Sequence, residues 1–319
     1  MPANILRQSR LIVRLSVFAV LLMIIILMCS AIIRLTQDNC ISLTTPDAIV
    51  VAARFIHRIS ASLVGIVLVI ILFLTVRLKP VPVNRIALLI ILIALTLFLA
   101  MLGKFSSGTI MPAITIANII AGMAMMTFFW LLRMDFNLAV QAPFHLSPRI
   151  IRSTRILAPL ALFFLLIQIC LGSWIAGLNA GIGCNHLPAT TSVIYWPDSL
   201  ILKAIDPFRI INVSENLMLS NAIAWLGFIH RLGSLIVVIA TIVLAVNLRQ
   251  YGTSLRRTTT VLLFFLVIQA LLGIAMVEWK TTGWIGVVHN AIAAFLLLQI
   301  INIYYWFSRN KADSVKNWK

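Results

Sequence analysis

The stretch Phe228-Ile229-His230-Arg231 lies inside a long apolar segment and repeats a tetrapeptide of the first half, Phe55-Ile56-His57-Arg58. A histidine and an arginine side by side are costly to bury in lipid, so such residues usually face a bundle interior, a partner or a ligand. Two copies of one histidine-bearing helix therefore predict a duplicated architecture with a polar feature in each half.

Composition favours a membrane protein. Of the 319 residues, 62% are hydrophobic and 10% are charged, and the mean hydropathy is +1.08. Apolar runs long enough to cross a bilayer recur along the chain, which is typical of a polytopic helical membrane protein. We expect eight transmembrane spans, at residues 12–33, 48–76, 86–103, 110–132, 156–178, 221–247, 259–277 and 283–307.

Charge alternates between successive connections of these spans. The formal net charge is +17, but Lys and Arg concentrate in every second connection and most Asp and Glu fall in the others. Under the positive-inside rule, this alternation places both termini in the cytoplasm. We therefore expect a multi-pass protein of the bacterial cytoplasmic (inner) membrane, in contact with the lipid bilayer and with no nucleic-acid partner.

Other matches between the halves recur at a nearly constant offset. Leu102-Gly103 matches Leu272-Gly273, and Asn118 aligns with His289. Each half holds four spans, an even number, so both halves enter the membrane in the same direction. The expected fold class is an all-α integral membrane protein whose eight transmembrane helices form two parallel four-helix-bundle repeats, residues 1–150 and 151–319.

His230 and His289 lie at similar depth in the second half, roughly 10 to 15 Å below the outer surface at about 1.5 Å per helical residue. Two neutral imidazoles that face each other across a four-helix bundle can form the axial pair of a haem iron. Arg231 can pair with a haem propionate, because a guanidinium matches carboxylate geometry. The alternative is that both histidines are packing residues with interhelical hydrogen bonds.

Several motifs carry a family resemblance: Gln168 to Gly172, Gly177 to Gly181, Trp196-Pro197, His230-Arg231, Gln269 to Gly273, and His289. They resemble segments of the haem A synthase family, membrane enzymes with two four-helix halves that oxidise a methyl group of haem O to the formyl group of haem A. The resemblance implies that His230 and His289 ligate a haem b in the C-terminal half and that the N-terminal half receives the substrate haem. It also implies haem O from a haem O synthase, an electron donor of unknown identity, and a role in cytochrome oxidase assembly; a homo-oligomer is one option.

The N-terminal half departs from the family pattern. The family has a glutamate three residues before the first-half histidine, where this chain has Arg54, and a later histidine that is Asn118 here. The Ser-Gly that follows Arg34-Leu35-Thr36 in the family is also replaced. A guanidinium only donates hydrogen bonds and asparagine is a poor iron ligand, so His57 would hold a haem alone or not at all.

Two interpretations follow. In one, His57 is a metal ligand and the candidate catalytic residue of a variant active site with an open iron position, and Arg54, Arg58, Asn118 and Arg231 bind the haem groups. In the other, catalysis is lost, and the chain is a non-catalytic haem b protein that carries electrons or delivers haem to an oxidase. A secondary transporter is a third class, but no broken helix with paired acids at mid-membrane supports it.

Two smaller features lie toward the outer side. Cys40 and Cys184 fall in equivalent external loops, where disulfides persist, so a bridge between these loops is a hypothesis. Gly177 and Gly181 are four residues apart, which predicts either close helix packing or close approach to a porphyrin face.

Overall fold

The computed structural model describes residues 3–37, 46–78, 81–105, 111–137, 148–179, 199–210, 216–249, 253–279 and 283–309. The regular elements within these ranges are all helices. They are α1 (Ala3–Gln37), α2 (Pro46–Arg77), α3 (Val83–Phe105), α4 (Pro112–Phe136), α5 (Pro148–Asn179), α6 (Ser199–Ala204), α7 (Asn216–Arg249), α8 (Thr253–Glu278) and α9 (Gly283–Arg309). Except for the short α6, these helices are long and apolar enough to cross a membrane, which confirms the expected all-α class with eight transmembrane helices; the parallel repeat stays a prediction.

The helices extend beyond the expected spans. α1 begins at Ala3 rather than residue 12, and α7 begins at Asn216 rather than residue 221. The physical reason is length, because the 35 residues of α1 rise by about 50 Å, whereas hydrocarbon is about 30 Å thick. Hydropathy detects only the part of a helix that lies in lipid. The short helix α6 was not predicted.

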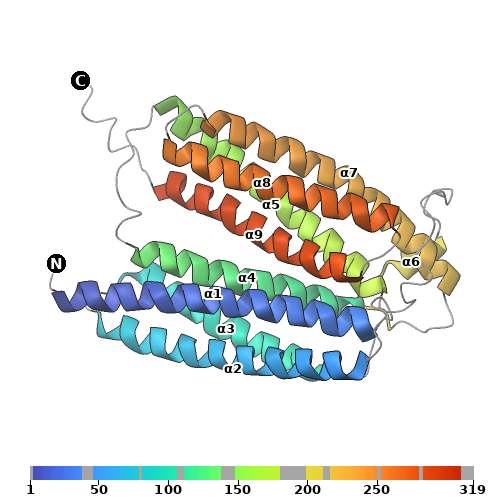
Figure 1. Cartoon of the computed structure of the whole chain (residues 1–319), viewed down its shortest axis with the longest axis horizontal. Helices are drawn as coiled ribbons and strands as arrows, with labels where there is room; N and C mark the ends of the chain where they lie inside the picture. The colour runs from blue at the N-terminus through green and yellow to red at the C-terminus, as the bar shows by residue number, and fades with distance from the viewer. Residues whose placement is uncertain are drawn as a thin grey trace.

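Helices α1 to α4 form one group, and α5, α7, α8 and α9 form a second group beside it; α1 begins and α9 ends at the same end of the bundle (Figure 1). In the first group α1 packs on α2 and α4, and α3 packs on α4; in the second, α5 packs on α7 and α9, and α8 packs on α9. The corresponding pairs thus make corresponding contacts, as the predicted repeat requires. One difference is that α7 and α8 pack along each other, whereas α2 and α3 touch only briefly.

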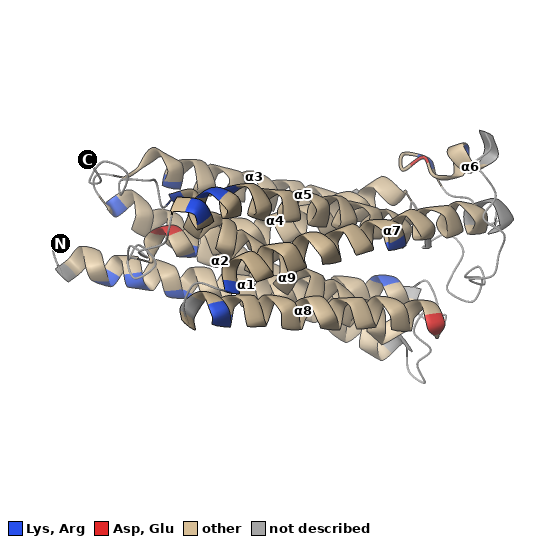
Figure 2. Ribbon diagram, turned by 90° about the horizontal axis from the view of Figure 1, so that it is seen from above, with Lys and Arg blue, Asp and Glu red and all other residues tan. Residues whose placement is uncertain are grey.

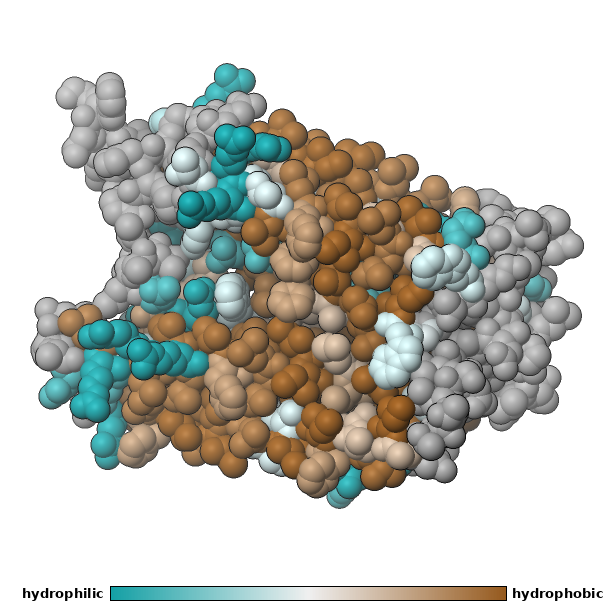
Figure 3. Space-filling model, in the orientation of Figure 1, coloured by the Kyte–Doolittle hydropathy of each residue, from teal (hydrophilic) through white to brown (hydrophobic). Residues whose placement is uncertain are grey.

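The two groups share one core. Buried residues of α4, including Met126 and Phe129, join buried residues of α5 and α9, such as Leu165 and Ile300, in a single cluster. The groups meet through α4 against α5 and α1 against α9. Large apolar side chains remain exposed on the outer helices, and they cover the middle of the face shown in Figure 3. This is the surface that lipid would cover.

Charged residues gather at the ends of the bundle. Figure 2 shows that most of the Lys and Arg residues lie at the end of the bundle where α1 begins and α9 ends. This arrangement agrees with the predicted cytoplasmic location of both termini, which stays a prediction.

A buried carboxylate joins the two groups near that end. Asp135 of α4 is 1% exposed and accepts a hydrogen bond from Arg85 Nε of α3 at 2.5 Å. It also pairs with Arg309 and accepts from the Tyr305 hydroxyl at 3.2 Å, both on α9. Asn84 Nδ2 adds a fourth contact at 3.2 Å. Asp135 therefore connects α3 and α4 with α9.

The opposite end has its own link between the groups. Trp174 Nε1 of α5 donates to the carbonyl oxygen of Ile205 at 2.9 Å, just after α6. Two residues later, the Pro207 carbonyl accepts from the backbone N–H of Ala113 in the first turn of α4, at 2.8 Å. The segment at 199–210 thus holds the outer ends of α4 and α5 together.

The sequence allowed two explanations for Gly177 and Gly181, close helix packing or contact with a porphyrin. A Cβ placed on Gly177 would lie 3.0 Å from Cα of Pro112, at the start of α4. This close approach of α5 to α4 accounts for the glycine as a packing residue. Gly181 lies outside the described residues.

Candidate functional site

His230 of α7 and His289 of α9 line one cavity of about 710 Å³. Helical spacing turns His230 inward, because it shares a stripe with Ile223, Leu226 and Val237, all buried. The sequence predicted that these two histidines face a common space, and the structure brings them together there. Most of the lining is apolar, with a few polar groups among it.

Each histidine ring lies against a glycine of a neighbouring helix. A Cβ on Gly172 of α5 would lie 3.2 Å from Cε1 of His230, tighter than ordinary van der Waals contact. A Cβ on Gly273 of α8 would lie 3.6 Å from Cε1 of His289, which is ordinary contact. The two rings therefore pack against backbone on one side, and the fit is tighter at His230.

A glutamine one turn before each glycine contacts the same histidine. Gln168 Nε2 donates to the carbonyl oxygen of His230. Gln269 lies with its side-chain nitrogen 3.0 Å from Nε2 of His289. Gly233 makes room for the first contact, because a Cβ there would lie 2.5 Å from Oε1 of Gln168.

The sequence did not assign roles to these residues. Its resemblance included both Gln-x-x-x-Gly motifs, but only as markers of a family. The available signal was their spacing, because residues four apart lie on one face of a helix. On one face of a helix, the glutamine can hydrogen-bond to a histidine residue while the glycine leaves room for the ring of that histidine.

These groups fit a porphyrin with two axial imidazoles. Nδ1 of His230 and Nδ1 of His289 are buried and have no hydrogen-bond partner among the described residues, which is costly for a polar atom. No cluster of three or more His, Cys, Asp or Glu side chains occurs in the described part of the chain. Haem iron takes only its axial ligands from the protein, so two histidines are sufficient to hold it.

The cavity reaches the surface between α7 and α8. Leu235 of α7 and Ile274 of α8 line it and are 57% and 59% exposed. Arg231 and Ala270 also line it and are exposed. Arg231 turns back along α7, so that its Nη1 lies 4.0 Å from a Cβ placed on Gly227. The opening thus faces lipid, with a guanidinium at its outer edge.

The candidate residues of the N-terminal half lie apart from this cavity. His57 is half-buried on the packed face of α2, in line with Ala53 and Ser60, whereas Arg54 and Arg58 are exposed. None of these residues lines the cavity of His230 and His289. The separation agrees with a distinct site in each half.

Asn118 makes a hydrogen bond with a residue of a neighbouring helix. Its Nδ2 donates to Ser30 Oγ of α1 at 3.4 Å. The next residues on α4, Ile119 and Met123, line the cavity of the C-terminal half. Asn118 thus lies in the wall between the two halves, directed toward α1.

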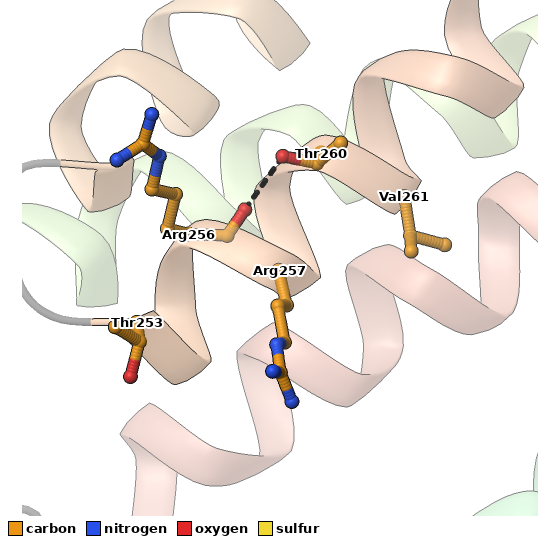
Figure 4. Close-up of a pocket in the computed structure, with 5 residues that line it drawn as sticks. All are labelled: Thr253, Arg256, Arg257, Thr260 and Val261. Atoms are coloured by element: carbon orange, nitrogen blue, oxygen red, sulfur yellow. Dashed lines mark hydrogen bonds between the residues drawn. The ribbon is translucent and has the colours of Figure 1, made fainter.

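A second pocket lies at the start of α8, near the predicted cytoplasmic side (Figure 4). It is lined by Thr253, Arg256, Arg257, Thr260 and Val261, and the two arginine side chains point in different directions. Thr260 Oγ1 donates to the carbonyl of Arg256 at 2.8 Å. The lining contains no histidine, cysteine or carboxylate, so this pocket is not a candidate for metal or redox chemistry.

Three features named from the sequence lie outside the described residues: Cys40, Cys184 and the Trp196-Pro197 pair. The disulfide between the two cysteines therefore stays a hypothesis.

Comparison with known proteins agrees with these features. The family model described as cytochrome oxidase assembly protein, COX15-CtaA, matches residues 41–301. A protein of Shewanella oneidensis named Heme A synthase is 30% identical over 264 residues, which is 79% of this chain and 75% of the relative. Proteins of that name from Flavobacterium psychrophilum and Rhizobium etli are 26% and 34% identical over 50% and 47% of the chain, and these matches span 46% and 39% of the relatives. With such a match over most of its length, this multi-pass membrane protein belongs to the COX15-CtaA family of cytochrome oxidase assembly proteins.

Proposed function

We propose that the chain is an oxidoreductase that converts haem O to haem A for a terminal oxidase. The observation that carries the proposal is the cavity in which His230 and His289 meet, each held by a Gln-x-x-x-Gly motif. The Heme A synthase relatives supply the reaction. Conversion of the methyl group to a formyl group adds one oxygen atom and removes four electrons and four protons relative to the methyl group plus water, so O2 or another electron acceptor must take up these electrons; where O2 also supplies the oxygen atom, an electron donor must complete its reduction to water.

The C-terminal half, residues 151–319, is the proposed haem b half. His230 and His289 would hold the haem iron, and bound haem would supply a one-electron redox centre. We therefore assign electron transfer to this half, and Arg231 at the cavity edge to a propionate.

The N-terminal half, residues 1–150, is the proposed substrate half. His57 is the only histidine on the described helices of this half, and Asn118 Nδ2 donates to Ser30 Oγ. His57 would hold the iron of haem O in this half, and the bound haem would be the group that is oxidised. Arg54 and Arg58, exposed on α2, would meet the carboxylates of this substrate.

The alternative is a non-catalytic haem b protein, and the specific observation in its favour is this Asn118–Ser30 contact together with Arg54. The test expresses the chain in cells that make haem O but lack their own haem A synthase, followed by chromatography of the extracted haems. Haem A in the extract supports the enzyme. Bound haem b without any haem A supports the alternative.

Two variants sharpen this test. His230→Ala with His289→Ala should abolish the low-spin haem b spectrum of the purified protein. Asn118→His with Arg54→Glu, added to a silent parent, should restore haem A if those positions caused the loss. Protein that is colourless under ample haem supply would refute haem binding altogether.

A further inference from the structure

The cavity of the C-terminal half is completed by the N-terminal half. Arg34 and Leu35 of α1, together with Ile119 and Met123 of α4, line it beside His230 and His289. The sequence placed the haem b site within the C-terminal repeat alone. The contribution of α1 therefore needs its own explanation.

The outer end of α1 packs directly on the histidine helix. Ala31 and Leu35 of α1 form one buried cluster with Val287 of α9, and these three residues are 1%, 7% and 1% exposed. Val287 precedes His289 by two residues, which is about 3 Å along the helix. Arg34, next to Leu35, is thus held slightly to the outer side of His289.

A second guanidinium borders the same part of the cavity from the other side. Arg231 follows His230 on α7, and its Nη1 turns back toward Gly227, one turn to the outer side of the ring. The cavity therefore has imidazoles at its middle and one arginine from each half toward its outer end. The rest of its lining is mostly apolar.

This distribution matches a flat apolar ligand with two carboxylates on one edge. We infer that Arg34 donates hydrogen bonds to one carboxylate of the porphyrin held by His230 and His289, while Arg231 serves the other. Arginine suits this role because its donors match a carboxylate in pairs. The inference rests on the proposed function, and it makes the haem b site a joint product of both halves.

A carboxylate of the protein could also pair with Arg34. Glu278 at the end of α8 also lines the cavity and is exposed. An arginine that serves Glu278 would stabilise the protein with or without a porphyrin. The experiment must separate these two partners.

The test titrates the full-length protein, purified in detergent without added haem, with two probes. One is ferric protohaem, and the other is its dimethyl ester, in which both carboxylates are blocked. Arg34→Gln should raise the Kd of protohaem about tenfold, in line with the loss of one charge-assisted hydrogen-bonded pair, and leave the Kd of the ester within about twofold. Arg34→Lys should recover part of the loss, because the charge remains.

The control is Arg256→Gln at the far end of α8, which should change neither Kd. Equal weakening of both probes by Arg34→Gln would overturn the inference, as would no weakening of either. If Arg34→Gln and Glu278→Gln each weaken protohaem and its ester equally, the partner of Arg34 is the carboxylate of Glu278 and the inference is overturned. If the wild-type chain gives no bis-imidazole spectrum with either probe, the haem b proposal itself fails, which is a distinguishable result.

Discussion

Gly172 and Gly273 offer a matched pair of substitutions that tests the histidine site. A Cβ at position 172 would lie 3.2 Å from His230 Cε1, whereas a Cβ at position 273 would lie 3.6 Å from His289 Cε1. Carbon atoms in good contact lie about 3.5 to 4.0 Å apart, so alanine fits at 273 and forces the His230 ring to shift at 172. Gly172→Ala should therefore weaken haem binding, and Gly273→Ala should not.

The size of the effect follows from the displacement. A shift of a few tenths of an ångström moves the imidazole off its preferred rotamer, at about 0.5 to 1.5 kcal/mol, or a roughly 2- to 12-fold rise in Kd. Against this, alanine gains about 0.8 to 1.0 kcal/mol of helix propensity over glycine at either site. Gly273→Ala should thus raise thermal stability and keep haem affinity, whereas Gly172→Ala should lose affinity despite the same helical gain.

The assay combines a haem titration followed at the Soret band with thermal unfolding of the haem-free protein. Affinity and stability then move in opposite directions only for Gly172→Ala. Equal haem affinity in the two variants would refute the assigned contact between Gly172 and His230. A larger loss for Gly273→Ala would refute the difference in fit between the two rings.

Three further outcomes are expected. Gln269→Leu should remove the contact with His289 and weaken haem binding by about 1 kcal/mol, or roughly fivefold, in the same titration. Asp135→Asn should lower the free energy of unfolding in detergent by about 2 to 4 kcal/mol and leave the haem spectrum unchanged. This loss is somewhat below the figure for a fully buried pair because Arg309 is partly exposed. An unaltered melting curve would count against the contact of Asp135 with α3 and α9. Ala270→Trp, at the opening between α7 and α8, should slow haem uptake and haem release by the same factor in stopped-flow measurements, so that Kd stays unchanged. Unaltered rates would exclude haem entry through this opening.

The sequence predicted those parts of the site that depend on the depth of a residue in the membrane and on the repeat between the two halves. Equal distance from the helix start placed His230 and His289 at one level, and the repeated tetrapeptide marked the helix that carries the first of them. Both signals are linear along the chain, so no packing information was needed. Long apolar runs located the spanning helices for the same reason.

Other features depend on rotation about helix axes and on how the two halves meet. Arg34 is near the end of α1, and nothing local indicates that this end reaches a cavity of the other half. The partners of Asp135 lie on α3 and α9, far apart in the sequence, and a charge count assigns them only to one side of the membrane. The structure is required to bring such groups together.

The predicted repeat indicates that the N-terminal half differs from the C-terminal half at more positions than Asn118, which stands where the second half has His289. Aligned by Ser30 with Ser173 and by Gly103 with Gly273, the first half has other residues where the second has its supports. Cys29 stands in the place of Gly172, Ile25 in that of Gln168, and Leu99 in that of Gln269. Of the four supporting positions, the first half keeps only the glycine at 103.

These differences predict a graded response to repair. Asn118→His alone should not add a second low-spin haem, because the new ring would lack a supporting amide and would meet Ser30 instead. Adding Leu99→Gln should supply the equivalent of the Gln269 contact, so the double variant should bind more haem per protein than the single one. Haem stoichiometry measured as the pyridine haemochrome, with His230 and His289 intact, reports the difference. A second bis-imidazole haem in the Asn118→His single variant would show that ligands alone define such a site, and that the glutamines and glycines around His230 and His289 are dispensable for holding the rings.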